Sequence, residues 1–414
     1  MESSRPRTDP ISPRGEPVRP PSSGRAGAAS PDSVRAPSQD LVRALTDERV
    51  VLALIEHRRL TRAELAAAIG ISKPTAGESV RRLTERGLVA DTGERTQGGR
   101  GRGRVGSYYA LAPSIGGALA VTIGPEGVGD GLSGSRPGAA VVAQCLDVYG
   151  DDIASVTRHA EPSGVGAALA DAVGEVRHRV PRPVRLAVVS AADPVDRATG
   201  RLVQLPDSPF LVGELDPVKI ISAYVDGPVT VDNDVNWAAA AEGQQDFAYL
   251  YLGEGLGAAI VDDGGIRRGS SGLTGEISHL LTAGPQGRAI PFIDLFGQLG
   301  LRKPGTTAID VARLKKSSAA DREMIAAAVC GVIAAVIALA DPKEIVVGGS
   351  WGPFLIDEIR AVVARMPRQV PLRAAASAGS PASAGSPVSA GSPASAGVRA
   401  EAVSRLRAWV TANL

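Results

Sequence analysis

The sequence is poor in cysteine and has no excess of charge of either sign. Its two cysteines, Cys145 and Cys330, lie far apart in apolar surroundings, without a C-x-x-C pair. This excludes a disulfide framework and a cysteine-rich zinc site, and it favours the reducing cytosol. With 45 Lys and Arg against 44 Asp and Glu, the net charge is +1. The overall charge therefore argues neither for nor against a nucleic-acid partner, and the distribution of charge has to decide.

Long apolar segments are also scarce. Residues 1–36 are rich in Pro, Ser, Arg and Gly without a period, which excludes a secretory signal and predicts a disordered tail. An uncharged run that could be taken for a membrane span, residues 324–340, is short for a bilayer, consists largely of Ala and contains Gly331. A helix that is apolar all round is also typical of a protein core, so we expect a buried helix and no membrane partner.

The region after this tail opens with three helical patterns. Apolar residues at near-helical spacing predict one helix, or a broken pair of helices, over residues 38–57. Thr61 and Glu64 have the spacing of a capping box, which opens a second helix that Gly70 can end. Ser72 can cap a third helix a few residues later. Two helices joined by so short a turn are typical of a helix-turn-helix.

A predicted β-hairpin follows the third helix. Residues 88–89 and 107–111 favour strands, and the segment between them is rich in Gly and Arg. From Arg81 to Leu111 there are seven Arg against three acidic residues, a local charge of +4. A surface helix pair with a basic linker is the alternative for a basic patch alone. The full order of elements instead predicts an α+β winged helix-turn-helix over residues 37–112.

The residues expected at DNA lie at the start of the third helix and in the hairpin tip. A helix-turn-helix inserts the start of its second helix into the major groove, where polar, small or basic side chains are suitable. Glycines in the tip let the backbone approach phosphates closely. The residues predicted to contact double-stranded DNA are Ser72, Lys73, Thr75, Ser79, Arg81, Arg82, Arg100, Arg102 and Arg104.

From residue 113 onward the pattern changes. Apolar, strand-like stretches such as VRLAVVS and FAYLYLG alternate with helical or loop segments, which predicts an α/β body over residues 113–414. Residues 375–397 repeat a Ser-Ala-Gly-Ser-Pro unit. This unit is too small and flexible to form a core, so we expect a disordered insertion there and a final helix over residues 398–414.

Three segments of the body resemble the ROK family of repressors and sugar kinases. They are the Asn-Asp pair in VDNDVNWAAAAEG, the Gly-x-Gly-x-Gly turn in LYLGEGLGAA, and the stretch GEISH. The order of a winged helix first and an α/β body second is also similar. The resemblance implies a two-lobed sugar-kinase-like body of the actin-like (ribonuclease H-like) type, in a homodimer or homotetramer.

The resemblance also implies a sugar site. In the family's kinases the Asp of the Asn-Asp pair takes a proton from a sugar hydroxyl, and Asp234 matches that position. Asn233, Glu276 and His279 match positions that hold sugar hydroxyls, and Asp294 replaces a further family glutamate. Carboxylates and an amide suit vicinal hydroxyls, because they offer acceptors and donors in a fixed geometry.

Two departures from the family argue against catalysis and metal binding. The family's phosphate loop, Asp-x-Gly-Gly-Thr, corresponds to the stretch VTIGP, with Thr122 for the Asp and Pro125 for the second Gly. Proline has no N–H to offer a phosphate, so we expect no ATP use and no catalytic residue. Residues 280–301 lack the cysteines of the family's zinc site, so we expect no metal and no cofactor.

The sequence therefore predicts a cytoplasmic DNA-binding regulator, a repressor of carbohydrate-related genes, whose kinase-like body senses a sugar or sugar phosphate without catalysis. Two alternatives stay open. Asp234 keeps an ATP-dependent sugar kinase with a DNA-binding arm in consideration. Asp294 and the altered phosphate loop favour instead a ligand-independent DNA-binding protein whose body serves only dimerisation.

Overall fold

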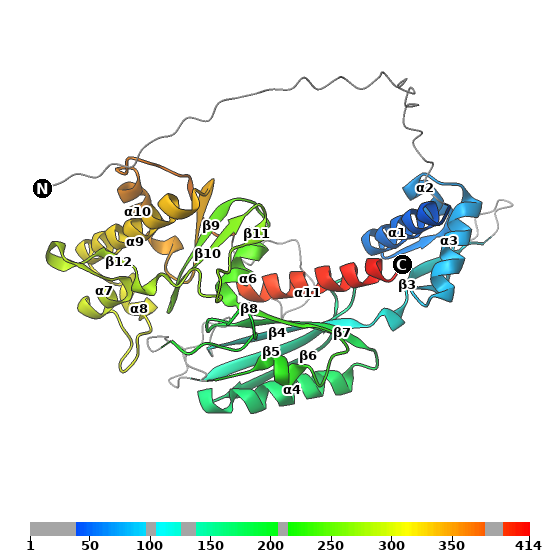
Figure 1. Ribbon diagram of the computed structural model, residues 1–414, viewed down its shortest axis with the longest axis horizontal. Coiled ribbons are helices and arrows are strands. Elements are labelled where there is room, and N and C mark those ends of the chain that lie inside the picture. Colours follow the sequence, from blue (N-terminus) through cyan, green and yellow to red (C-terminus); the bar gives the residue numbers. More distant parts are fainter. Residues whose placement is uncertain (1–38, 97–104, 126–137, 206–213, 377–391) are drawn as a thin grey trace, which may run out of the picture. The chain divides into compact units, whose positions relative to one another are not determined.

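A computed structural model describes residues 39–96, 105–125, 138–205, 214–376 and 392–414 (Figure 1). Apart from residues 39–42 at the start of the first helix, the elements below belong to one compact unit, Arg43–Leu414. The predicted tail lies outside the described residues, as does most of the Ser-Ala-Gly-Ser-Pro repeat.

The N-terminal elements form a winged helix-turn-helix. Its three-stranded sheet has the order β1-β3-β2, with both neighbouring pairs antiparallel. The sequence-based prediction missed β1, which is only three residues long and follows the first helix after a single residue. The elements are α1 (Gln39–His57), β1 (Arg59–Thr61), α2 (Arg62–Ile69), α3 (Lys73–Glu85), β2 (Val89–Arg95) and β3 (Ser107–Leu111).

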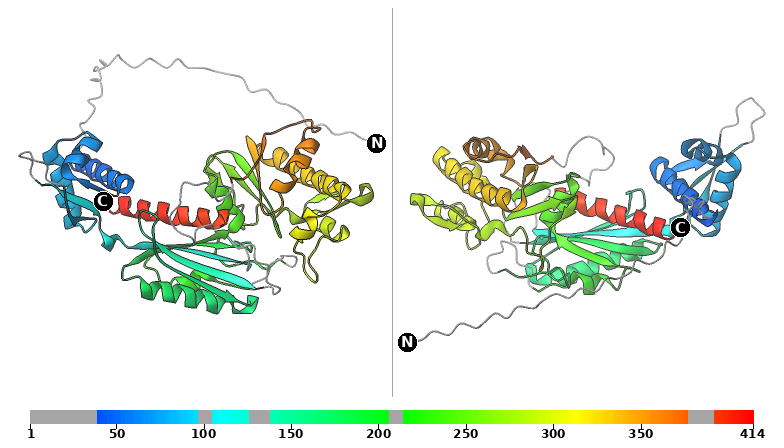
Figure 2. Two further views of the ribbon diagram at one scale, coloured as in Figure 1. Left: turned by 180° about the vertical axis from the view of Figure 1, so that it is seen from behind. Right: turned by 45° about the horizontal axis from the view of Figure 1, so that its top comes forward.

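The first lobe of the body is a five-stranded sheet of order β6-β5-β4-β7-β8. Helix α4 covers one face and the C-terminal helix α11 covers the other (Figures 1 and 2). Its elements are β4 (Gly117–Pro125), β5 (Ala139–Leu146), β6 (Asp152–Ala160), α4 (Val165–Arg179), β7 (Val184–Ala191), α5 (Pro217–Ile221), β8 (Val229–Asn233) and α11 (Pro393–Ala412).

The second lobe contains a sheet of order β11-β10-β9-β14-β15 and a small β12-β13 hairpin. Its elements are α6 (Asp234–Ala241), β9 (Phe247–Leu252), β10 (Leu256–Asp262), β11 (Gly265–Ile266), the 3₁₀ turn η3 (Ile277–His279), β12 (Leu281–Ala283), β13 (Ala289–Pro291), α7 (Phe292–Gln298), α8 (Val311–Lys315), α9 (Ala319–Ala340), β14 (Glu344–Gly348), α10 (Ile356–Val363) and β15 (Leu372–Ala374). The two sheets confirm the predicted α/β body.

Helix α9 contains the uncharged run of residues 324–340. By length and composition it is able to cross a membrane, and half of its most apolar window is buried within the protein. Ile325, Val329, Ile333 and Ile337 lie in the core of the second lobe. This periodic burial is that of a core helix, as the sequence predicted.

The final helix begins earlier than the sequence predicted. We expected it from residue 398, after an insertion ending at 397, but α11 starts at Pro393, with the Ser392 side chain accepting from the Ser395 N–H. Gly397, predicted to lie in the insertion, packs against α6: a Cβ there would lie 1.9 Å from the Trp237 carbonyl oxygen. A Ser cap, a Pro in the first turn and a close helix crossing explain why repeat residues become helical.

Candidate functional site

The helix-turn-helix is built by two side-chain caps. The Thr61 hydroxyl accepts from the Glu64 N–H at 3.2 Å, and the Glu64 carboxylate accepts from the Thr61 N–H at 2.8 Å. Gly70 ends α2 with φ of 68°, a left-handed conformation that glycine adopts without strain. The Ser72 hydroxyl then accepts from the Thr75 N–H and opens α3. All the predicted caps are confirmed.

The residues at the start of α3 are accessible. Ser72, Lys73 and Thr75 are all exposed, as a helix that enters the major groove requires. These side chains form the part of α3 that is suited to DNA phosphates and base edges.

Two predicted DNA contacts are corrected by the structure. Ser79 is completely buried and donates to Asp47 of α1. Arg82 is largely covered, and its Nε and Nη2 donate to the two oxygens of the same carboxylate at 3.1 and 2.6 Å. Both residues therefore fasten α3 to α1 instead of facing outward. The spacing of Ser79 and Arg82 along α3 did not predict these contacts, because the sequence does not show that Asp47 is buried.

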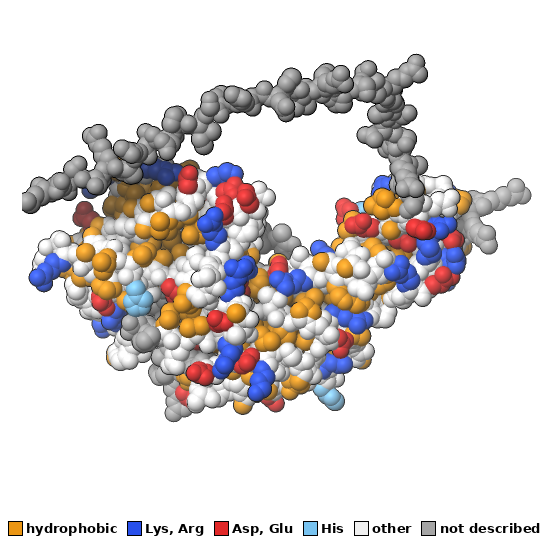
Figure 3. All heavy atoms as spheres, viewed as in Figure 1, with side chains coloured by type: hydrophobic (Ala, Val, Ile, Leu, Met, Phe, Trp, Pro, Cys, Tyr) orange, Lys and Arg blue, Asp and Glu red, His pale blue; other side chains and the backbone are white. Residues whose placement is uncertain are grey.

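The remaining predicted arginines fall into two groups. Arg81 is exposed and ion-paired within α3 to Glu78 and Glu85. Figure 3 shows basic and acidic side chains interspersed over this domain. The other three, in the hairpin tip, lie outside the described residues: Arg100, Arg102 and Arg104.

The predicted sugar site begins at the carboxyl ends of two parallel strands. Neighbouring strands β7 and β8 pair in parallel, with Ala191 opposite Asn233. Asn233 caps α6: its Oδ1 accepts from the Val235 N–H at 2.9 Å, and its Nδ2 donates to the Asp193 carbonyl at 3.3 Å. Asp234 is the first residue of α6. This edge of an α/β sheet is where ligands commonly bind.

Three carboxyl groups lie within electrostatic reach of one another at this edge. The pKa of Asp234 is raised to about 7, mainly by burial and also by the nearby Asp193 and Glu276, against a backbone hydrogen bond from Val235 that lowers it. The pKa of Glu276 is also raised to about 7, mainly by burial and in addition by Asp193. The structure thus brings Asp234 and Glu276 together, and it adds Asp193, which is 3% exposed.

The other predicted sugar residues follow Glu276 along the chain. Gly275 has φ of 100°, and a Cβ there would lie 1.9 Å from the Ala258 carbonyl oxygen, so only glycine permits this turn into η3. His279 ends η3 and is exposed. Asp294, on α7 beside η3, is exposed and hydrogen-bonded to Arg302 at 2.9 Å. No contact joins Asp294 to the three carboxyl groups within the described residues.

The stretch that corresponds to the family's phosphate loop and the Gly-x-Gly-x-Gly turn are both unsuited to phosphate. Strand β4 continues through Thr122 to Pro125, which pairs with Ala139, so these residues form strand and not a phosphate-binding turn. The Gly-rich turn between β9 and β10 carries Glu254, whose carboxylate accepts from Lys303 at 2.6 Å. Lys303 is thus already paired with Glu254, and this pair offers no net positive charge to a phosphate.

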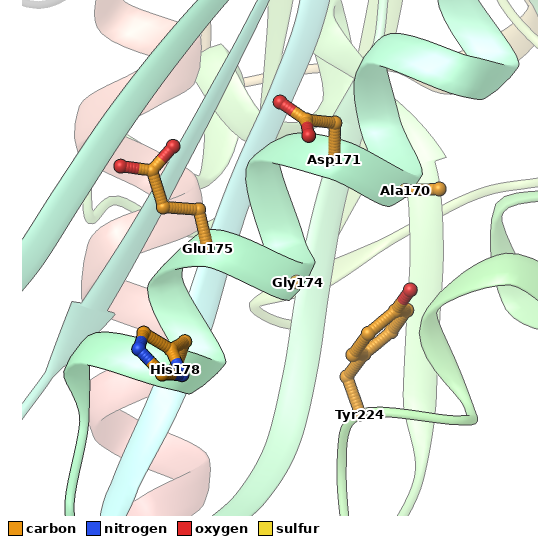
Figure 4. A pocket seen from close by; sticks show the side chains of 6 residues that line it. All are labelled: Ala170, Asp171, Gly174, Glu175, His178 and Tyr224. Atoms are coloured by element: carbon orange, nitrogen blue, oxygen red, sulfur yellow. The ribbon is translucent and has the colours of Figure 1, made fainter.

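A shallow pocket elsewhere in the first lobe contains none of the predicted residues. Asp171, Glu175 and His178 line it from α4, and Tyr224 lies on the other side of this helix, next to Gly174 (Figure 4). Arg158 donates to both acidic side chains and Arg179 donates to Glu175, so two arginines balance the charges of the two carboxylates. The pocket is therefore a weaker ligand site than the edge of β7 and β8.

Sequence reasoning missed three charged residues around the site: Asp193, Asp232 and Arg268. Asp193 follows β7 by two residues, and Asp232 is the last residue but one of β8. The available signal was positional, because both acids end an apolar strand. Arg268, which donates to Asp232 from beyond β11, carried no signal of its own.

Comparisons with known proteins agree with this arrangement. Residues 141–290 match the ROK family, and residues 43–90 match a winged helix-turn-helix DNA-binding domain. The xylose repressor of Bacillus spizizenii is 22% identical over 255 residues, which are 58% of this chain and 62% of the repressor. The glucokinase of Halalkalibacterium halodurans is 41% identical over 69 residues, 15% of this chain and 21% of the glucokinase. The chain thus spans less than two thirds of these curated relatives.

A solved structure has a similar fold over most of this chain. It is described as a ROK family transcriptional regulator, a homologue of the E. coli MLC protein, and it is similar with a TM-score of 0.54 at 17% identity. The similarity covers 89% of this chain and 99% of that one, and at this identity it shows the fold. The chain therefore carries a ROK family domain joined to an N-terminal winged helix-turn-helix domain.

Proposed function

We propose that this protein is a DNA-binding transcriptional regulator, a repressor of carbohydrate-related genes, whose ROK domain binds a sugar or sugar phosphate without transforming it. It acts in the cytoplasm as a homodimer or homotetramer, because paired reading helices match the two halves of a palindromic operator. The domains run over residues 37–112 and 113–414.

The observation that carries this proposal is the accessible start of α3 on a domain that shares a core with the ROK domain. Leu406 and Val410 of α11 belong to the same buried cluster as Leu54 and Leu83 of the winged domain. A rearrangement of the ROK domain therefore changes the packing of the winged domain and moves its reading helix, α3.

Polar contacts support the same connection. The Tyr149 hydroxyl accepts from the Leu111 N–H at 3.1 Å and donates to the Arg58 carbonyl at 3.0 Å. Arg86, which ends α3, donates to the Asn413 carbonyl at 2.9 Å. An effector that prefers one arrangement tenfold shifts the equilibrium by about 1.4 kcal/mol, which a few hydroxyl hydrogen bonds supply.

The effector site we propose consists of Asn233, Asp234 and Glu276, with His279 and Asp294 on the adjoining turn and helix. Its amide and carboxyl groups suit sugar hydroxyls. Support for binding without catalysis comes from Pro125 in strand β4 and from the pair of Glu254 with Lys303 at the Gly-rich turn, which offers no net positive charge to a phosphate.

Fluorescence anisotropy on the chain's own upstream DNA tests the proposal. We expect tighter binding than to scrambled DNA, a steep dependence on salt, and release by one member of a sugar and sugar-phosphate panel. Glu276→Ala should abolish release while DNA binding persists. Equal affinity for both DNAs would refute the regulator, and DNA binding that no effector and no Glu276→Ala change alters would point to a body that serves only dimerisation.

One observation favours a second candidate, an ATP-dependent sugar kinase. A general base works best with a pKa near the working pH, and the pKa of Asp234 is about 7. An assay of ADP release over the same sugar panel decides between the two. Turnover that Asp234→Asn abolishes would establish the kinase, and no turnover with any sugar is the result that the regulator requires.

A further inference from the structure

One buried carboxylate next to the proposed site makes three hydrogen bonds. Asp232 is 5% exposed and precedes Asn233 at the end of β8. Its Oδ1 accepts from the Asn233 N–H at 2.8 Å and from the Asn236 side-chain Nδ2 at 2.7 Å. This oxygen fixes the first turn of α6, which displays Asn233 and Asp234.

The second oxygen of the same carboxylate bonds to a different sheet. Asp232 Oδ2 accepts from Arg268 Nε at 2.6 Å. Arg268 follows β11, at the edge of the second lobe's sheet, and it begins the loop that leads to Glu276. Asp232 thus holds both the segment with Asp234 and the segment with Glu276.

Contacts of Arg197 and Gly272 keep these two segments close together. Arg197, in the first lobe, donates from its Nη1 to the Gly269 carbonyl at 2.9 Å and from its backbone N–H to the Ser271 carbonyl at 3.2 Å. A Cβ on Gly272 would lie 2.1 Å from the Val195 carbonyl oxygen, so glycine is required at this approach. The loop after β11 is therefore fastened along the first lobe beside the site.

We propose that Asp232 is a positioning residue, which touches no ligand itself but aligns, through its pair with Arg268, the two walls of the effector site. One wall carries Asn233 and Asp234 and the other carries Glu276. The inference rests on the proposed function, because it assumes that a sugar binds between these walls.

A neighbouring ion pair shows why the pair of Asp232 with Arg268 is different. Arg267 and Asp262 also pair, but both are about half exposed and both belong to the second lobe. Exposed ion pairs contribute little to stability, and the pair of Arg267 with Asp262 does not link separate segments. Removing one partner of a covered pair leaves the other charge without compensation. Asp262→Asn is therefore the matched control for Asp232→Asn.

The variant Asp232→Asn cuts only one of the two connections. Its carbonyl oxygen keeps the bonds to Asn233 and Asn236, while its NH2 group faces Arg268, donor against donor. Adding Arg268→Gln restores the connection, because the amide of Gln is as many bonds from the backbone as Arg Nε. Rescue by this pair separates positioning from a general loss of structure. Arg268→Met, at a partly exposed position, replaces Asp232→Asn should that variant not fold.

The test combines hydrogen exchange with calorimetry on the full chain. We expect Asp232→Asn to raise amide exchange over residues 268–276 several-fold, to weaken effector binding about tenfold or more, and to leave DNA affinity without effector unchanged. The double variant should recover both properties, and Asp262→Asn should alter neither. Unchanged exchange in Asp232→Asn and Arg268→Met would overturn the inference, as would weaker effector binding that the double variant does not recover.

The two readouts also separate this inference from the proposed function. If no sugar or sugar phosphate binds the unaltered protein, the proposed effector function fails. Exchange over residues 268–276 then decides the alignment by itself: an increase that the double variant reverses supports it, and no increase refutes it.

Discussion

The raised pKa of Asp234 predicts that removing its charge stabilises the protein, and does so more at high pH. A pKa of about 7 in place of 3.8 means that ionisation costs the folded state about 4 kcal/mol, at about 1.36 kcal/mol per pKa unit. Water still reaches part of this side chain and screens part of that cost. We therefore expect Asp234→Asn to raise the free energy of unfolding by about 2 kcal/mol at pH 8.

The sign of the pH dependence follows from proton linkage. Between pH 4 and pH 7 the unfolded chain has released this proton while the folded protein keeps it. The contribution of Asp234 to stability is therefore present below pH 4 and is lost as the pH rises through 7. At pH 5 the gain from Asp234→Asn should be less than half of the gain at pH 8.

Urea unfolding of the unaltered protein and of Asp234→Asn, at pH 5 and pH 8, measures this directly. Asp357→Asn is the control, because Asp357 is an exposed carboxyl group at the start of α10 and should give no gain at either pH. Equal pH dependence in the unaltered protein and in Asp234→Asn would refute the idea that burial and the neighbouring carboxyl groups raise the pKa of Asp234.

Three further outcomes are expected. Gly77→Ala should stabilise the protein by about 0.5–1 kcal/mol in thermal unfolding, because the new methyl group meets only the Arg62 side chain, at 3.7 Å; a lower melting temperature would contradict this. Lys73→Ala should reduce the slope of log affinity for DNA against log salt by about 1, whereas an unchanged slope would remove Lys73 from the phosphate contacts. Gly397→Val should separate α11 from α6 and destabilise the chain by at least ~2 kcal/mol in urea, so unchanged stability would refute the close crossing at Trp237.

Much of the winged domain follows from the sequence, because local interactions form it. Thr61, Glu64, Gly70 and Ser72 act on backbone groups within a few residues, and their spacing alone predicts where α2 and α3 begin and end. Strand β1 was missed because three residues carry no period, and its pairing partner β3 lies about fifty residues away.

The body divides along the same line. Apolar runs predict strands buried on both faces, such as β7 and β9. Strand β6 has no such run, because it lies at the edge of its sheet and mixes polar with apolar residues, so the sequence did not predict it. The start of α11 was missed because small repeat residues become helical only when Gly397 packs on Trp237.

What the sequence by itself determined is the order of elements, the caps, and the residue types Asn233, Asp234 and Glu276 that suit a sugar. Only the tertiary structure decided which charges face inward. Ser79 and Arg82 fit a DNA contact by spacing, yet a carboxylate from another helix, Asp47, draws them into the core. Long-range pairs of this kind have no period and no fixed spacing in the sequence. Their two partners meet only in the folded protein, so the sequence alone does not reveal them.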